Sequence, residues 1–110
     1  MTGRARFRPL AIKDLIAIAD WLATEAQSRA VGQEFVARLR QRCHAIAALP
    51  GTLGRARDDL GSGIRSLAWR NYVILFRYFD GELQVVRIIH GQRDLPAMLA
   101  PNPEAPNQEA

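Results

Sequence analysis

The residues best able to do chemistry gather around the end of the last predicted strand. This group is entirely basic and comprises Arg65, Arg70, Arg87, His90 and Arg93. A histidine can transfer a proton and arginines can stabilise a phosphate group, so the set could form a nuclease site. In the structural alternative, Gly91 permits a turn, Arg93 pairs with a carboxylate and His90 packs at a strand end. Spacing alone favours the structural alternative.

Other chemical signals are weak. The two histidines, His44 and His90, lie far apart in the sequence and have no third ligand near them, so no metal site is expected. The single cysteine, Cys43, excludes an internal disulfide and falls on an apolar helical stripe, which favours a core position. The glycines of residues 50–63 lack the lysine of a phosphate-binding loop. We therefore expect no cofactor.

Charge predicts acidic partners. All of the 15 basic residues except Lys13 are arginine, and the formal net charge is +4. Arginine binds carboxylates and phosphates through two parallel hydrogen bonds, so nucleic acid or an acidic protein segment is the expected partner. The alternative is an ordinary solvated basic surface.

Length and composition predict one small domain. The chain has 110 residues and is 48% hydrophobic, which suits a single core. We assign residues 1–99 to this domain and residues 100–110, rich in proline and asparagine, to a disordered tail. No apolar run is long enough for a membrane span, and the N-terminus does not read as a secretory signal. A reducing cytoplasm is the expected location.

Hydrophobic periodicity predicts an α+β fold of order β-α-α-β-β-β. Apolar residues recur at helical spacing over residues 10–26, from Ile12 to Ala26, and again over residues 29–49. A short break between these segments predicts an αα-hairpin. Strands are predicted at 4–8, 64–69, 72–79 and 83–90, residues 50–63 as a loop, and 92–99 as a short closing helix or coil. We expect an antiparallel sheet with the helical hairpin packed on one face.

The register of the last hairpin decides what the other face carries. A two-residue turn at Asp80 and Gly81 would bury one arginine on each face of a regular ladder. A three-residue loop that pairs Tyr78 with Glu82 puts Arg77 and Arg87 on the same face, and we prefer it for that reason. The helix-free face then reads as an apolar protein-binding site made of Val73, Leu75, Arg77, Leu83, Val85, Arg87 and Ile89.

With these elements in place, the sequence resembles the RelE/ParE superfamily of bacterial toxin–antitoxin modules. The resemblance runs from about residue 5 to 98 and rests on the element order together with four segments. These are Ala11-Ile-Lys-Asp-Leu-Ile-Ala-Ile-Ala-Asp-Trp-Leu; Leu49-Pro50 with Leu53-Gly54-Arg55; Gly63-Ile64-Arg65-Ser66-Leu67 leading to Arg70-Asn-Tyr-Val-Ile-Leu-Phe-Arg77; and Val86 to Leu95, Val-Arg-Ile-Ile-His-Gly-Gln-Arg-Asp-Leu. The last segment, with His-Gly-x-Arg-Asp, is most similar to the ParE branch.

The resemblance implies a toxin that a cognate antitoxin neutralises. ParE-like members are described as poisoning DNA gyrase, whereas RelE-like members are ribosome-dependent ribonucleases that cut messenger RNA. Val73 stands where RelE-like toxins tend to carry arginine, and no tyrosine follows Tyr78. We therefore favour a non-enzymatic gyrase inhibitor. The alternatives are a ribonuclease using Arg65, Arg87, His90 and Arg93, and a non-toxic remnant that only binds its antitoxin.

The resemblance also implies partners. The expected antitoxin has a DNA-binding N-terminal domain and an acidic, apolar C-terminal segment, and forms a hetero-oligomer with the toxin. Its segment is expected to lie against the helix-free face and the helical hairpin. The candidate contacts with gyrase are the basic residues at the sheet end, Arg65, Arg70, His90 and Arg93.

Overall fold

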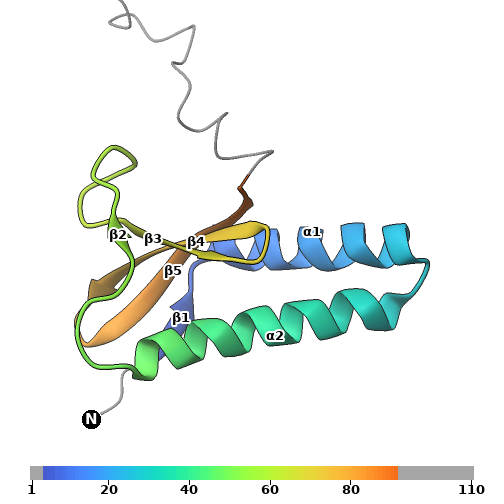
Figure 1. Ribbon diagram of the computed structural model, residues 1–110, viewed down its shortest axis with the longest axis horizontal. Helices are drawn as coiled ribbons and strands as arrows, with labels where there is room; N and C mark the ends of the chain where they lie inside the picture. The colour runs from blue at the N-terminus through green and yellow to red at the C-terminus, as the bar shows by residue number, and fades with distance from the viewer. Residues whose placement is uncertain (1–3, 92–110) are drawn as a thin grey trace, which may run out of the picture.

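The computed structural model describes residues 4–91, and these form two helices and five strands (Figure 1). The predicted closing element, the tail and Arg93 lie outside the described residues. In chain order the elements are β1 (Ala5–Phe7), α1 (Pro9–Ala26), α2 (Arg29–Ala48), β2 (Arg55–Ala56), β3 (Arg65–Trp69), β4 (Tyr72–Phe79) and β5 (Glu82–His90). The predicted α+β class and the order of the predicted elements are confirmed, with β2 as an addition inside the segment predicted to be a loop.

The strands form one sheet in the order β1-β5-β4-β3-β2. Strands β2 to β5 pair antiparallel, but β1 runs parallel to β5, with Ala5 opposite Leu83. The prediction of an antiparallel sheet was wrong for this pair. The two strands are joined through the whole chain, so no short turn forces them to run in opposite directions.

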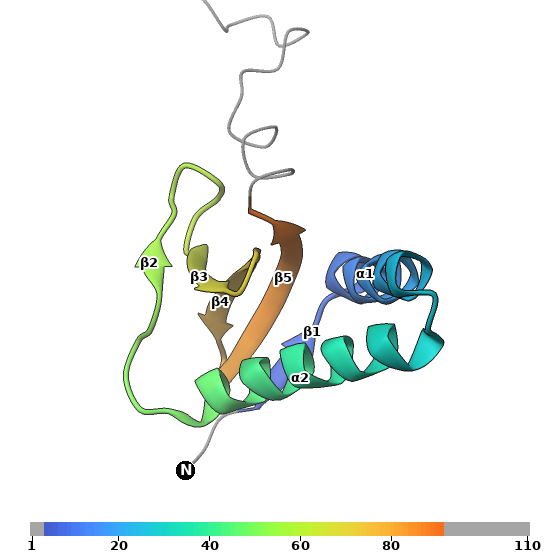
Figure 2. The ribbon, with the colours of Figure 1, turned by 45° about the vertical axis from the view of Figure 1, so that its right-hand side comes forward.

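The two helices pack against each other as an antiparallel hairpin beside the sheet (Figures 1 and 2). Helix α1 starts with Pro9 at its first turn and ends at Ala26, and the capping residue Gln27 that follows has a φ of 54°. Ser28 caps α2, since its side chain accepts a hydrogen bond from the Val31 N–H. Gly32 lets the helices approach closely, because a Cβ atom there would lie 2.2 Å from the carbonyl oxygen of Ala19.

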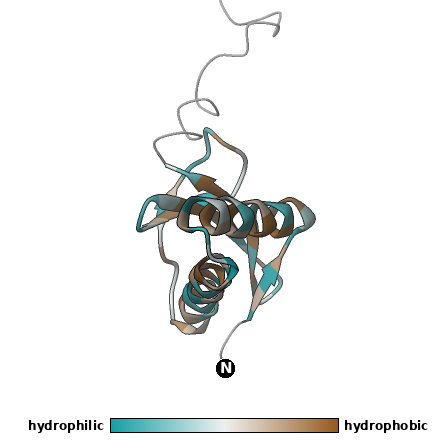
Figure 3. Cartoon of the chain, turned by 90° about the vertical axis from the view of Figure 1, so that its right-hand side faces the viewer, coloured by the Kyte–Doolittle hydropathy of each residue, from teal (hydrophilic) through white to brown (hydrophobic). Residues whose placement is uncertain are grey.

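The main core lies between the helical hairpin and one face of the sheet, which we call the covered face. Phe76, Ile74 and Val85 are fully buried there against Leu39 and Ile46 of α2. Helix α1 turns Ala11, Leu15 and Ile18 toward the core. Two residues of the predicted inward stripe, Ile12 and Ile16, are instead exposed. The apolar stripe on α1 is therefore wider than the part of the helix that packs into the core. Figure 3 shows hydrophobic and hydrophilic residues alternating along both helices.

The β4–β5 hairpin follows neither of the two regular registers considered from the sequence. Its turn has two residues, Asp80 and Gly81, so Tyr78 pairs with Leu83 and the preferred three-residue loop was wrong. A bulge then inserts Val86 opposite the step between Phe76 and Leu75. Beyond this bulge Leu75 pairs with Arg87, which keeps that arginine off the covered face. A two-residue turn was rejected because it would bury an arginine on each face of a regular ladder. The bulge prevents this, since it places Arg77 and Arg87 on the same face.

The opposite face of the sheet, which we call the open face, is partly covered by the chain between β2 and β3. Leu60 and Ile64 from that segment pack against Leu75 and Ile89. The backbone N–H of Arg57 donates to the carbonyl of Ile64 and closes this segment over the sheet. The expectation of a bare apolar face was therefore wrong, because residues 57–64 supply a second small core.

Candidate functional site

The residues proposed for a ribonuclease lie on two faces of the sheet. Arg65 pairs with Phe76, whose side chain is on the covered face, whereas Arg87 pairs with Leu75 on the open face. Residues paired directly across two strands point to the same side of a sheet. The sheet itself therefore separates Arg65 from Arg87, and the structure does not bring the predicted set together.

Arg65 is held by the backbone. Its Nε donates to the carbonyl of Leu53 at 2.7 Å, and a terminal nitrogen donates to the carbonyl of Gly54 at 2.8 Å. These bonds attach the segment after α2 to β3. The side chain thus has a structural role that accounts for an arginine at this position.

Arg87 is bound by a carboxylate that the sequence analysis did not single out. Asp14 of α1 accepts two hydrogen bonds from Arg87, at 2.8 and 3.1 Å, and a third from the backbone N–H of Ile88 at 2.9 Å. Strand β1 pairs with β5 only as far as Val85, so Asp14 caps the strand edge beyond it. The sequence did contain one signal for this contact. Asp14 directly precedes the inward-facing Leu15, and a carboxylate next to the core requires a partner.

The remaining basic candidates lie at the end of the sheet where β5 finishes. Arg70 is exposed in the turn between β3 and β4, and its guanidinium carbon lies 4.7 Å from the centre of the Trp69 ring. The His90 ring meets the Tyr72 ring edge-on at 5.3 Å between centroids, on the covered side of the sheet. We call the surface around a hollow of about 300 Å³ the sheet-end surface; it comprises Trp21, Leu22, Phe35, Arg70, Asn71, Tyr72 and His90.

Most of the predicted antitoxin-binding residues are not available for contact. Leu83 and Val85 belong to the core of the covered face, with exposed fractions of 1% and 0%, because the two-residue turn reverses the side they occupy. Gln84 and Val86 take their places on the open face. Of the remaining predicted residues, Leu75 and Ile89 are buried, Arg87 is bound to Asp14, and the partly exposed ones are Val73 and Arg77.

A second apolar surface lies between the two helices, on the hairpin that the antitoxin was expected to contact, but the residues that form it were not identified from the sequence. Exposed Ile12 and Ile16 border a hollow of about 300 Å³, with Ile16 exposed by 58%. We call it the helical groove; it is lined by Ile12, Leu15, Ile16, Ala19, Gln33, Val36, Ala37 and Arg40. Helical spacing identified these positions as apolar but could not say which of them face the sheet.

Metal and thiol chemistry find no support among the described residues. No group of three or more histidine, cysteine, aspartate or glutamate side chains there could hold a metal ion. Burial raises the pKa of the Cys43 thiol to about 12, against the opposing effect of Arg40 and Arg42, so this residue is a neutral core group at ordinary pH. Within residues 4–91, neither helix combines the length and apolarity that crossing a membrane requires.

Comparison with known proteins identifies the family. Residues 5–95 match the family described as ParE toxin of type II toxin-antitoxin system, parDE. Toxin ParE3 of Caulobacter vibrioides is 32% identical over 62 residues, which are 56% of this chain and 61% of that protein. The chain thus matches about three fifths of this relative's length.

The fold agrees with a solved relative. A chain from the structure described as the chromosomal ParDE TA system from P. aeruginosa superposes with a TM-score of 0.66 at 20% identity and covers 81% of this chain and 96% of that one. This likeness supports the fold, while the family match supports the ParE branch that the resemblance indicated. The chain belongs to the ParE toxin family of type II toxin–antitoxin systems.

Proposed function

We propose that this protein inhibits DNA gyrase by binding it, in the cytoplasm, and that a cognate antitoxin neutralises it. Membership of the ParE toxin family makes a toxin the starting assumption. The observation that carries the choice of mechanism is the position of Arg65 and Arg87 on opposite faces of the sheet. An inhibitor that acts by binding does not need these residues to converge.

The ribonuclease alternative would need converging groups. Proton transfer requires a base within hydrogen-bond reach of the reacting atom, and phosphate stabilisation requires a cation on the same side. His90 and Arg87 lie three residues apart on β5 and face opposite sides, and Asp14 binds the guanidinium of Arg87. Arg65 is on the same side as His90, but its guanidinium is held by the carbonyls of Leu53 and Gly54. These contacts favour binding over catalysis.

The sheet-end surface is the part we assign to gyrase. Arg70 is exposed there, and stacking on Trp69 holds its guanidinium in place with its charge at the surface. Trp21 lies beside it and is 47% exposed, which suits a contact residue that buries a large ring on binding. Arg65 is a weaker candidate, since its two bonds to backbone carbonyls hold it within the fold.

The helical groove is the part we assign to the antitoxin. Ile12 and Ile16 present an apolar strip, and Arg40 adds a positive charge at its border. An amphipathic helix with an acidic flank matches this combination of shape and charge. The open face would take a further part of the same antitoxin, so that one wrapped segment contacts both surfaces and forms a hetero-oligomer.

The test uses purified protein in two assays, gyrase supercoiling and a translation extract scored for messenger RNA cleavage. We expect loss of supercoiling, its recovery on adding the antitoxin encoded beside the gene, and no cleavage. His90→Gln keeps hydrogen bonding without titration, so folded His90→Gln protein should still inhibit supercoiling, losing at most one contact of the sheet-end surface. Cleavage by the wild type, abolished in folded His90→Gln protein, would replace the gyrase proposal with the ribonuclease.

A variant that removes one charge from the sheet-end surface tests the assignment of this surface to gyrase. Arg70→Ala should reduce inhibition, because it removes the exposed charge of the sheet-end surface, while Arg29→Ala at the start of α2 serves as a matched exposed control. Equal inhibition by both variants would remove the sheet-end surface from the contact with gyrase. Inhibition of neither supercoiling nor translation, with the antitoxin still bound, would indicate the non-toxic remnant.

A further inference from the structure

A cavity on the open face combines apolar walls with two arginines. Its volume is about 340 Å³, within the range of pockets that hold small ligands or single side chains. It lies where the start of α1 meets the bulge of β5 and the segment before β3. We call it the Arg8–Arg77 cavity, and its lining residues are Arg8, Pro9, Leu10, Ile64, Arg77 and Val86.

The walls come from elements that the sequence alone does not bring together. Ile64 is buried and belongs to the small core beneath residues 57–64, so it provides a fixed wall. Val86 is the extra residue of the β-bulge and is present on this face because of it. Leu10, by contrast, is 53% exposed at the rim. An apolar group entering between these side chains would therefore cover surface that is now in water.

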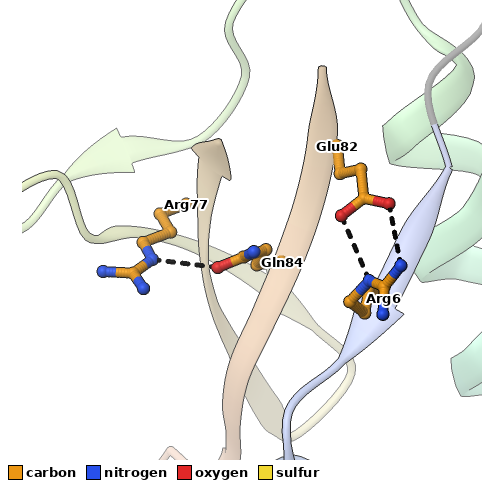
Figure 4. A network of polar contacts seen from close by, with 4 residues as sticks. All are labelled: Arg6, Arg77, Glu82 and Gln84. Atoms are coloured by element: carbon orange, nitrogen blue, oxygen red, sulfur yellow. Dashed lines mark hydrogen bonds and ion pairs between the residues drawn. The ribbon is translucent and has the colours of Figure 1, made fainter. Parts of the chain in front are cut away.

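The two arginines are placed to receive negative charge. Within residues 4–91, Arg6, Arg38, Arg57 and Arg87 each form an ion pair with a carboxylate, but Arg8 and Arg77 form none. Glu82, the nearest carboxylate along β5, is taken by Arg6 through two hydrogen bonds (Figure 4). The cavity thus holds two positive charges that the described part of the fold leaves unbalanced.

Arg77 is also oriented in advance. Its Nε donates to the amide oxygen of Gln84 at 3.2 Å, and Gln84 is itself buried, with an exposed fraction of 7%. Figure 4 shows the terminal nitrogens of Arg77 turned away from Gln84. A guanidinium fixed at Nε can still present its two terminal nitrogens to a carboxylate at little further entropic cost. The helix dipole gives the start of α1 a partial positive charge, which adds to the potential of the cavity. The first turn contains no acidic residue that would offset this charge.

We propose that the Arg8–Arg77 cavity binds an acidic peptide segment whose apolar side chain enters between Leu10, Ile64 and Val86 and whose neighbouring carboxylates pair with Arg8 and Arg77. The inference rests on the proposed function in one respect: the antitoxin is the protein that supplies this segment. A second copy of this chain fits less well, since it would set arginines against arginines. Nucleic acid would satisfy the arginines but leave Leu10 and Val86 uncovered.

The test measures the affinity of the antitoxin for variants of the cavity. For the double variant Arg8→Gln with Arg77→Gln, we expect the Kd to rise about tenfold or more and the salt dependence of binding to weaken. The matched control is Arg29→Gln with Arg55→Gln, which removes two exposed arginines outside the cavity and should leave the Kd unchanged. Thermal unfolding of each toxin verifies that it is folded.

A second variant keeps the test decisive if Arg77→Gln impairs folding. Leu10→Asp places a carboxylate at the rim, where it should pair with the arginines and repel the segment, and the exposure of Leu10 makes this change tolerable for the fold. We expect Leu10→Asp to weaken antitoxin binding about as strongly as the double variant.

The outcomes separate this inference from the proposed function. Failure of wild-type toxin to bind the antitoxin would overturn both. Binding that neither the double variant nor Leu10→Asp weakens would overturn the cavity assignment and leave the proposed function standing. If the variants still bind the antitoxin but no longer bind a 20-base-pair DNA duplex that the wild type binds, the cavity belongs to nucleic acid instead. If the wild type sediments as a dimer and the variants sediment as monomers, the cavity belongs to a second copy of the chain.

Discussion

The two faces of the sheet are built from the same strands and are both apolar, yet one forms the main core and the other stays partly exposed. The covered face meets two long helices and contains the fully buried Phe76 and Val85. The open face meets only the short segment that contributes Leu60 and Ile64, and it keeps Arg77 partly exposed. The difference teaches that the number of apolar residues on a face does not determine its role. What decides the role is how much of that face the rest of the chain covers.

The same contrast separates two arginines of the β4–β5 hairpin. Arg87 is bound by Asp14 and is 34% exposed at its side chain, so its charge is balanced within the fold. Arg77 has only the neutral Gln84 as a hydrogen-bond partner among the described residues and remains available to a partner's carboxylate. Arg87 therefore contributes to stability, whereas Arg77 is the arginine that we assign to partner binding.

The largest expected effect compares two phenylalanines on β4. Phe76→Ala empties a fully buried site on the covered face and should lower the free energy of unfolding by about 3–5 kcal/mol. Phe79→Ala, at a position that is 58% exposed, should change it by about 0.5 kcal/mol or less. Urea denaturation of both variants provides the measurement. Similar losses for the two would contradict the assignment of stability to the covered face.

The next effect compares the two arginines. Arg87→Gln leaves Asp14 without its cation and should cost about 2 kcal/mol, less than for a fully buried pair because Arg87 is partly exposed. Arg77→Gln removes no ion pair and should cost about 0.5 kcal/mol, while weakening antitoxin binding more than Arg87→Gln does. Denaturation and binding measured on the same samples test both statements, and a reversed order in either would break the contrast.

Cys43 tests how dry the core under the covered face is. Burial raises the pKa of its thiol to about 12, whereas a thiol in the unfolded chain titrates near 8.5. Above the unfolded value only the unfolded chain loses this proton, so stability is complete below about pH 8.5 and falls as the pH rises toward 12. At pH 10.5 the loss should be about 2–3 kcal/mol.

The matched variant for this effect is Cys43→Ala. It lacks the thiol but shares every other titrating group, so the difference between the two free energies of unfolding isolates Cys43. That difference should shrink by about 2–3 kcal/mol between pH 8 and pH 10.5. A difference that stays constant over this range would mean that water reaches the thiol.

Local pattern was sufficient to predict most elements of the fold. Helical spacing located α1 and α2 to within one residue of their observed bounds, and turn residues separated β3, β4 and β5. The parallel pairing of β1 was missed because its partner β5 lies at the other end of the described chain. Strand β2 was missed because two residues are too few to show a strand pattern. The bulge at Val86 was missed because β-branched residues such as valines fit a regular strand equally well.

The candidate site was predictable only in part, for the same reason. Composition identified arginines as the important charges, but not which of them the fold would use. Asp14 binds Arg87 across 73 residues of sequence, and no local spacing reveals that contact. The face assigned to Leu83 and Val85 was wrong because a single residue of register moves a side chain through the sheet.

The smallest expected effect concerns the turn that sets this register. Asp80 and Gly81 have φ values of 53° and 77°, the two left-handed positions that a two-residue hairpin turn requires. A Cβ atom at Gly81 would meet nothing within 4 Å, so any cost of substitution comes from the backbone alone. Gly81→Val should therefore lower the free energy of unfolding by about 1 kcal/mol, while Gly81→Asn should cost clearly less, because asparagine tolerates this conformation. Thermal denaturation of the three proteins decides the matter. Equal stability would mean that the turn does not hold the register that separates the covered face from the open one.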